Sequence, residues 1–139
     1  MSRFPGRKVI VTGAGRGIGQ ATALAFAAEG AEVLAVGRTT SDLGETVDRI
    51  TQAGGSAWLG ECDVTDEAAV DAVVARAAER WGTIDVLINN AGIDDDTPFL
   101  DIDRARWRAV IETNLTGAFL MAQAVARRMA AAGGGVILH

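Results

Sequence analysis

The sequence predicts a protein of the α/β class, in which the strands of a parallel sheet alternate with helices. Short apolar runs alternate with longer amphipathic stretches along the whole chain, and the runs are apolar on successive residues. Strands of that kind are buried on both faces, and the helices between them form the crossovers of a parallel sheet. A third observation is the glycine-rich turn that joins the first predicted strand to the first predicted helix.

Five strands can be assigned in order along the chain. They are predicted at KVIVT, AEVLAV, SAWLGECDV, DVLINN and GVIL, that is, at residues 8–12, 31–36, 56–64, 85–90 and 135–138. Helices are predicted from about Gly17, from about Ser41, from about Asp66, and from about Leu115 to Ala132. We therefore expect a doubly wound parallel sheet in the strand order 3-2-1-4-5, with helices on both faces and right-handed crossovers.

The helix that begins near Asp66 has the clearest periodicity. Its apolar residues recur at helical spacing and form one stripe: Val70, Val73, Val74, Ala77, Ala78 and Trp81. Asp66 is expected to cap the start of this helix, and Gly82 lies just past its end. Gly30 and the pair Gly54 and Gly55 follow the two earlier helices in the same way.

Composition restricts the class of protein. The 139 residues are 49% hydrophobic and 22% charged, which is typical of one globular domain spanning residues 1–139. The net charge of -5 disfavours nucleic acid as a partner. The longest apolar runs are shorter than the roughly 20 residues of a membrane span, and no signal peptide is visible, so we expect no membrane partner. Because a single cysteine, Cys62, cannot form an internal disulfide, we expect a cytoplasmic location.

The glycine-rich turn, TGAGRGIG at residues 12–19, predicts a dinucleotide site. Glycines at a turn from strand to helix let the backbone approach a pyrophosphate, and the N–H groups and dipole of the helix start favour its negative charge. A tight turn with close helix packing would use the same glycines. A strand before the turn, a helix after it and a second strand that ends near Val36 favour dinucleotide binding.

The glycine spacing also carries a family resemblance. Gly13, Gly17 and Gly19 form G-x-x-x-G-x-G rather than the commoner G-x-G-x-x-G. Three further motifs follow in order: Asp63 with Val64, NNAG at 89–92 and NLTG at 114–117. Together these motifs resemble the short-chain dehydrogenase/reductase family, over the whole chain but over only about the first half of a typical member. The resemblance implies a Rossmann-type NAD(P)-binding domain that is incomplete at its C-terminus.

The resemblance implies a set of cofactor-binding residues. The pyrophosphate and ribose would be lined by Gly13, Arg16, Gly17, Ile18 and Gly19. Asp63 and Val64 would flank the adenine, with the Asp63 carboxylate accepting from its exocyclic amine. The end of the fourth strand would place Asn90, Ala91 and Gly92 against the cofactor. From the residues alone, Asp63 could also cap a turn, and Asn89 and Asn90 could be loop formers, but the cofactor-binding interpretation is favoured.

The end of the second strand decides between NAD and NADP. A carboxylate there binds the ribose 2'-hydroxyl, whereas an arginine favours a 2'-phosphate. No carboxylate lies between Glu32 and Asp42, and Arg38 occupies the selective place, with Arg16 able to reach the same phosphate. We therefore expect NADP, with NAD possible; if both arginines are merely solvated, the site would accept either cofactor.

Most of the family's catalytic residues have no counterpart in this chain. The family uses a tyrosine as general acid/base, a lysine that lowers its pKa, a serine that orients the substrate and an asparagine that holds a water. Asn114 matches the asparagine. The chain has no tyrosine, its one lysine is Lys8 at the start of the first strand, and none of its serines follows the last strand. We expect the chain to be either a fragment of a longer enzyme or a truncated gene product.

Three other features have simpler interpretations than a catalytic site. His139 is interpreted as a strand residue rather than a substitute base, and Asp94–Asp96 as a solvated loop rather than a metal site, so that no metal is expected. The helix at 115–132 could be core or a subunit contact. Because the corresponding helix of the family commonly packs against its copy, we expect a homo-oligomer, a dimer or tetramer.

These observations favour an NAD(P)-dependent oxidoreductase that moves a hydride between the nicotinamide and a small carbonyl or alcohol substrate. A redox-inert dinucleotide-binding module is the alternative, since the serine, tyrosine and lysine are absent. A methyltransferase with the same sheet is disfavoured, because its cofactor wants an acidic residue where Arg38 stands.

Overall fold

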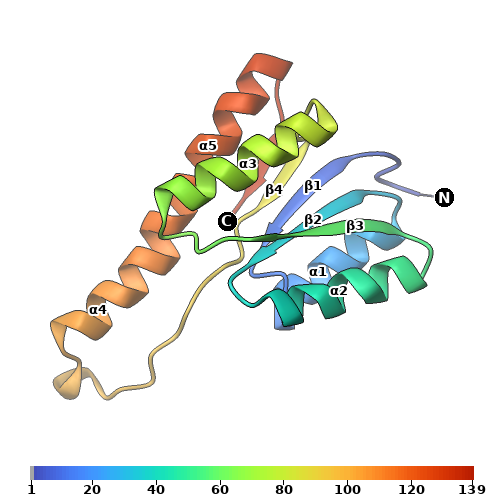
Figure 1. The fold of residues 1–139 in the computed structure, drawn as a ribbon. Coiled ribbons are helices and arrows are strands. Elements are labelled where there is room, and N and C mark those ends of the chain that lie inside the picture. The colour runs from blue at the N-terminus through green and yellow to red at the C-terminus, as the bar shows by residue number, and fades with distance from the viewer. Residues whose placement is uncertain (1) are drawn as a thin grey trace.

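The computed structural model describes residues 2–139 and contains a five-stranded parallel sheet (Figure 1). The strands are β1 (Lys8–Thr12), β2 (Glu32–Gly37), β3 (Ser56–Glu61), β4 (Val86–Ile88) and β5 (Val136–Leu138). Their order is β3-β2-β1-β4-β5, and every neighbouring pair is parallel. The predicted doubly wound sheet and its strand order are confirmed, with β1 between β2 and β4.

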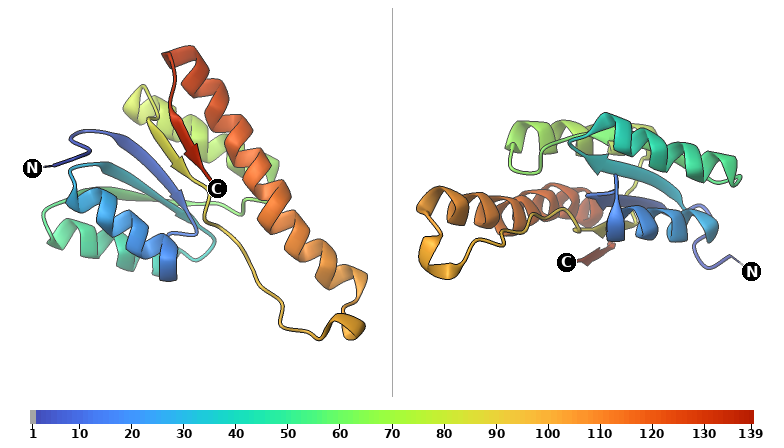
Figure 2. Two further views of the ribbon diagram at one scale, coloured as in Figure 1. Left: turned by 180° about the vertical axis from the view of Figure 1, so that it is seen from behind. Right: turned by 90° about the horizontal axis from the view of Figure 1, so that it is seen from below.

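The helices form a layer on each face of the sheet (Figure 2). Helices α1 (Gly17–Ala28) and α2 (Thr40–Gln52) pack together on one face, and α3 (Glu67–Trp81) and α5 (Gly117–Ala132) pack together on the other. The remaining helical segments are a 3-10 turn η1 (Phe99–Asp101), helix α4 (Arg104–Ile111) and a π-helical turn η2 (Glu112–Thr116). Helix α4 extends away from the sheet (Figure 1).

The central strands are buried on both faces, as their continuous apolar runs predict. Ile10 of β1 packs into the core beneath α3 and α5, whereas its neighbours Val9 and Val11 pack into the core beneath α1 and α2. In β2, Leu34 and Ala35 divide between the two cores in the same way. A strand that serves two cores can carry no exposed polar face.

Helix α3 begins and ends where its sequence predicts. The Asp66 carboxylate accepts a hydrogen bond from the Ala69 N–H at 3.2 Å, and Gly82 follows the helix in the left-handed conformation with φ of 75°. Gly30 and Gly54 also have positive φ, at 87° and 83°. These glycines end helices because residues with a Cβ rarely adopt this conformation.

Two element boundaries differ from the sequence prediction. Strand β3 ends at Glu61 rather than at residue 64, because the chain turns at Asp63. The last helix begins at Arg104 rather than near Leu115, and it continues through η2 into α5. Asp103 caps this earlier start by accepting from the Arg106 N–H at 2.8 Å.

The continuous helix from Arg104 to Ala132 is long and apolar enough to cross a membrane by length and composition alone. Core helices of soluble proteins meet the same criterion, so a single helix of this kind is weak evidence. Only 22% of its most apolar window is buried within residues 2–139. The prediction of no membrane partner therefore remains a prediction.

Candidate nucleotide-binding site

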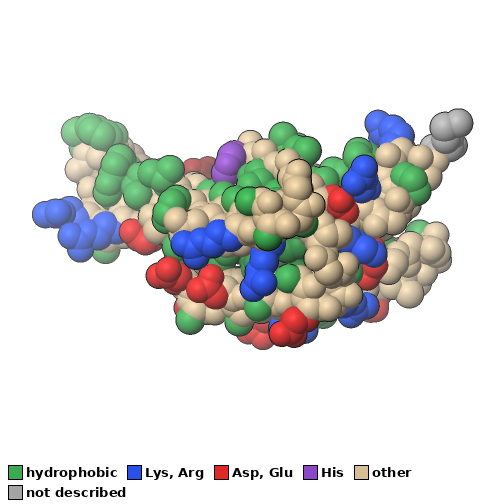
Figure 3. All heavy atoms as spheres, turned by 90° about the horizontal axis from the view of Figure 1, so that it is seen from above, with side chains coloured by type: hydrophobic (Ala, Val, Ile, Leu, Met, Phe, Trp, Pro, Cys, Tyr) green, Lys and Arg blue, Asp and Glu red, His purple; other side chains and the backbone are tan. Residues whose placement is uncertain are grey.

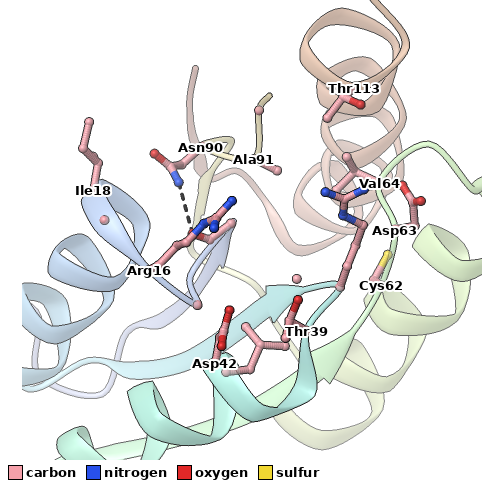
Figure 4. Close-up of a pocket in the computed structure, with 17 residues that line it drawn as sticks. Arg16, Ile18, Thr39, Asp42, Cys62, Asp63, Val64, Asn90, Ala91 and Thr113 are labelled. Atoms are coloured by element: carbon pink, nitrogen blue, oxygen red, sulfur yellow. Dashed lines mark hydrogen bonds between the residues drawn. The ribbon is translucent and has the colours of Figure 1, made fainter. Parts of the chain in front are cut away.

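A cavity of about 380 Å³ opens at the carboxyl edge of the sheet (Figure 4). Its walls come from the glycine-rich turn, from the ends of β2 and β3, from the loop after β4, and from the starts of α2 and η2. The lining residues are Gly13, Gly15, Arg16, Gly17, Ile18, Gly37, Arg38, Thr39, Asp42, Leu43, Cys62, Asp63, Val64, Asn90, Ala91, Gly92 and Thr113. Open α/β sheets bind ligands at this edge.

Ten of the eleven predicted cofactor-binding residues line this cavity, and the exception is Gly19. A Cβ at Gly19 would collide with the Gly13 carbonyl, so Gly19 allows α1 to pack directly beneath the turn. Gly13 and Gly17 have positive φ, at 64° and 56°, and the space beside Gly17 is open. The two alternatives left open by the sequence therefore both apply: Gly19 permits close packing of the helix, and Gly17 leaves the backbone open to a ligand.

The first turn of α1 can receive an anion. Arg16 lies at the N-cap, and its side chain makes no capping hydrogen bond to the N–H groups of that turn. Gly17 and Ile18 of this turn line the cavity. Free N–H groups at the positive end of a helix dipole are the arrangement that binds phosphates.

Thr12, which sequence reasoning did not select, joins the two loops of the site. Its buried hydroxyl accepts from the N–H of Asn90 at 3.0 Å and from the N–H of Ala91 at 2.9 Å. The Asn90 side chain in turn donates to the carbonyl of Thr12 at 3.1 Å and to that of Gly13 at 3.4 Å. The loop after β4 is thereby fixed to the glycine-rich turn. In the sequence, the signal for this role was a hydroxyl-bearing residue at the last position of the first strand.

Asp63 both forms a turn and lines the cavity, so the two interpretations of the sequence are compatible. One carboxylate oxygen accepts from the Thr65 N–H at 3.0 Å and from the Thr65 hydroxyl at 2.8 Å. These hydrogen bonds, aided by the positive charge of Arg38, lower the pKa of Asp63. Val64 is held in place by α5, since a Cβ at Gly117 would come within 2.5 Å of Val64 Cγ2.

Asn114 lies in the π-helical turn and does not line the cavity, although its neighbour Thr113 does. Its side-chain amide donates to the Ile93 carbonyl at 2.9 Å and accepts from the Ile93 N–H at 2.8 Å. The side chain therefore fixes the loop after β4. Thr113 was missed because it faces the cavity only through the irregular turn.

The other titratable residues considered for catalysis or metal binding do not line the cavity. Lys8 lies at the opposite edge of the sheet, where its amine pairs with Glu32 at 2.6 Å. His139 Nδ1 lies 3.4 Å from the side-chain amide of Asn89. Within residues 2–139 no three His, Cys, Asp or Glu side chains group closely enough to hold a metal ion. In the Asp94–Asp96 loop, Asp95 pairs with Arg106 at 3.4 Å.

Cys62 lies at the back wall of the cavity and is buried. Burial, together with the negative charges of Asp63 and Asp66, raises the pKa of its thiol to about 11. The neutral thiol therefore behaves as an apolar wall rather than as a nucleophile at neutral pH.

A parallel sheet in this order, with a glycine-lined cavity at its carboxyl edge, defines a Rossmann-type dinucleotide-binding fold. Residues 7–139 match the family model described as short chain dehydrogenase. The chain therefore belongs to the short-chain dehydrogenase/reductase family of NAD(P)-dependent oxidoreductases.

Individual relatives agree with this assignment. The chain is 47% identical over 130 residues to the short-chain reductase protein NovJ of Streptomyces niveus, a match that covers 94% of this chain and 50% of NovJ. It is 40% identical over 140 residues to a sorbitol dehydrogenase of Cereibacter sphaeroides, covering 99% of this chain and 53% of that protein. The chain spans about half the length of these relatives.

Two of the similar solved structures contain different cofactors. A metagenomic short-chain oxidoreductase in complex with NADP has a TM-score of 0.92 and 36% identity, and the match covers 98% of this chain and 62% of that one. A 7α-hydroxysteroid dehydrogenase complexed with NADH and 7-oxo glycochenodeoxycholic acid has a TM-score of 0.92 and 39% identity, covering 97% of this chain and 52% of that one. The fold is thus compatible with either dinucleotide.

Proposed function

We propose that the protein is an NADP-preferring oxidoreductase that transfers a hydride between the nicotinamide and a carbonyl or alcohol carbon of a small molecule in the cytoplasm. The observation that carries the cofactor preference is the pair of arginines in the cavity wall. Arg38 follows β2 directly, at the place that selects between the two cofactors, and Arg16 lies in the glycine-rich turn. Guanidinium groups bind phosphates through charge-assisted hydrogen bonds, so this wall favours a 2'-phosphate.

A pair of glycine variants tests dinucleotide binding at this site. Gly17 and Gly54 both have positive φ and open space beside them, but Gly17 lines the cavity and Gly54 follows α2 elsewhere. Both Gly17→Ala and Gly54→Ala should lose about 1 kcal/mol of stability. Only Gly17→Ala should weaken binding of NADPH and NADH, measured by calorimetry. Equal affinities in the two variants would contradict the proposed site.

In this function the chain's own residues bind and orient the dinucleotide, and the nicotinamide supplies the hydride. The glycine-rich turn would hold the pyrophosphate, and Asp63 and Val64 would hold the adenine. Asn90, Ala91 and Gly92 would line the path to the nicotinamide. Asn114 would position the loop after β4 and hold the water that relays a proton, as the family resemblance implies.

A redox-inert dinucleotide-binding module is a second candidate, favoured by the absence of tyrosine from the 139 residues. General acid/base catalysis contributes about 10²–10⁴-fold to such reactions. We therefore propose that these residues by themselves bind the dinucleotide without catalysing hydride transfer. The test is NADPH oxidation with a panel of aldehydes and ketones: binding without turnover is the expected result, and turnover by these 139 residues would overturn this proposal and exclude the redox-inert module.

We also propose that the partner of the α4–α5 surface is a second copy of the chain. Exposed apolar side chains recur along the continuous helix of α4, η2 and α5, at intervals of eight and four residues. They are Trp107, Leu115 and Phe119, which are 61%, 64% and 56% exposed. Phe99 and Leu100 in η1 extend the apolar surface, and hydrophobic side chains gather at the end of the molecule that α4 occupies (Figure 3). Exposed apolar surface of this extent is typical of an interface.

A further inference from the structure

The wall of the cavity beside Arg16 and Arg38 also contains a carboxylate. Asp42, in the first turn of α2, is half-buried and lines the cavity with both arginines. In Figure 4 its side chain extends from α2 toward the cavity. Within residues 2–139 the Asp42 carboxylate makes no ion pair and accepts no hydrogen bond from a protein group. Its charge is therefore available to whatever occupies this side of the cavity.

The position of Asp42 is fixed by the packing of α2. A Cβ at Gly15 would lie 2.9 Å from Asp42 Cβ, so the start of α2 lies directly against the glycine-rich turn. The Thr46 hydroxyl, one turn later, donates to the Ala14 carbonyl at 2.8 Å. Leu43 is fully buried and contacts the position of Gly37 at the end of β2. These contacts hold the backbone at Asp42 against the glycine-rich turn.

The charges on this wall do not all favour a phosphate. Arg38 is exposed, and its positive charge also acts on Asp63, which lines the same cavity. A carboxylate accepts a hydrogen bond from a ribose hydroxyl but repels a phosphate at the same place. The arginines and Asp42 therefore act in opposite directions on a 2'-phosphate.

We infer that Asp42 is a specificity-determining residue for the dinucleotide, which weakens the preference for NADP and lets NAD bind as well. The inference rests on the proposed function, because it requires the adenosine ribose to lie between the glycine-rich turn and the start of α2.

The test compares two ligands that differ only in the 2'-phosphate, adenosine 2',5'-bisphosphate and adenosine 5'-monophosphate. Their dissociation constants are measured by calorimetry for the wild type, for Asp42→Asn and for Asp48→Asn. Asp48 lies on the same helix, is exposed and does not line the cavity, so its variant is the control for the change in charge. Asp42→Asn should increase the preference for the bisphosphate by about five- to tenfold, and Asp48→Asn should leave it unchanged.

The possible failures are distinguishable. An unchanged preference in Asp42→Asn, or an equal change in both variants, would overturn the role of Asp42 while leaving dinucleotide binding intact. If the wild type bound neither ligand, the proposed function would be overturned and this inference with it. Asp42→Ala is the second variant if Asp42→Asn does not fold, because alanine also removes the charge and has the highest intrinsic helix propensity.

Discussion

Arg38 is the single residue with the largest expected effect on cofactor choice. Replacing it by aspartate removes a positive charge from the cavity wall and adds a negative one. Arg38→Asp should therefore shift the preference from NADP toward NAD by roughly 1 to 3 kcal/mol, the range for a charge-assisted hydrogen bond. The ratio of NADPH to NADH dissociation constants measures the shift.

The control for this variant is Arg127→Asp, which makes the same change in charge at an exposed position of α5. It should leave the ratio unchanged. If Arg38→Asp also left the ratio unchanged, the assignment of Arg38 to the 2'-phosphate would be wrong.

Cys62 gives a prediction about pH. Its folded pKa of about 11 lies above the reference value of 9.0, chiefly because of burial. The unfolded chain therefore releases this proton first, so the thiol costs no stability below about pH 9 and lowers stability as the pH rises from 9 toward 11. At pH 8 the folded protein should react with a thiol reagent at least about a hundredfold more slowly than the chain in denaturant, because less of it is thiolate. Equal rates would contradict both the burial and the raised pKa.

At the scale of elements, two helical glycines should respond to alanine in opposite directions. Gly44 lies in α2 with no atom within 4 Å of an added Cβ, so Gly44→Ala should stabilise the protein by about 0.5–1 kcal/mol. Gly117 begins α5, where an added Cβ would meet the stiff side chain and the carbonyl of Val64. Gly117→Ala should therefore destabilise it by about 1–3 kcal/mol. Denaturant unfolding of both variants measures the difference, and stabilisation by Gly117→Ala would show that the contact is not tight.

The same elements show what the sequence could predict. The strands and their order followed from local patterns, since continuous apolar runs identify buried parallel strands and the glycine-rich turn identifies the first crossover. The start of the last helix did not follow, because residues 111–116 combine β-branched side chains with Asn114 and lower the helix propensity there. Residues 112–116 of that stretch form the π-helical turn, in which the Asn114 side chain makes two hydrogen bonds to Ile93 in the loop after β4.

The residues of the candidate site also differ in whether local sequence patterns could identify them. Residues at strand ends, such as Arg38 and Asp63, could be selected from the sequence because all parallel strands end at one edge of the sheet. Asp42 and Thr113 could not, because each faces the cavity only through the packing of its helical segment against a distant loop. Thr12 was missed for a similar reason, since its hydroxyl contacts residues about 78 positions away.

At the scale of the whole molecule, the apolar stripe on α4 and α5 predicts self-association. Leu115→Lys combined with Phe119→Lys places two charges in the expected interface and should convert an oligomer to a monomer. Light scattering after size exclusion measures the mass. Gln52→Lys, at the exposed end of α2, is the control and should leave the mass unchanged. A monomeric wild type at micromolar concentration would contradict the proposed partner.

The sheet itself is uneven in the number of residues that each strand pairs. The ladder between β2 and β3 has six registered pairs and that between β1 and β2 has five, whereas the ladders from β1 to β4 and from β4 to β5 have three each. Local opening should therefore begin at β4 and β5 and leave the other three strands closed. The cavity spans this divide, with Gly13 on the long-ladder side and Asn90 on the short-ladder side, joined by the Thr12 hydroxyl. A dinucleotide bound across the cavity would contact both parts of the sheet and raise the free energy of opening of β4 and β5. Ligand binding should therefore make the unfolding of the whole sheet more cooperative.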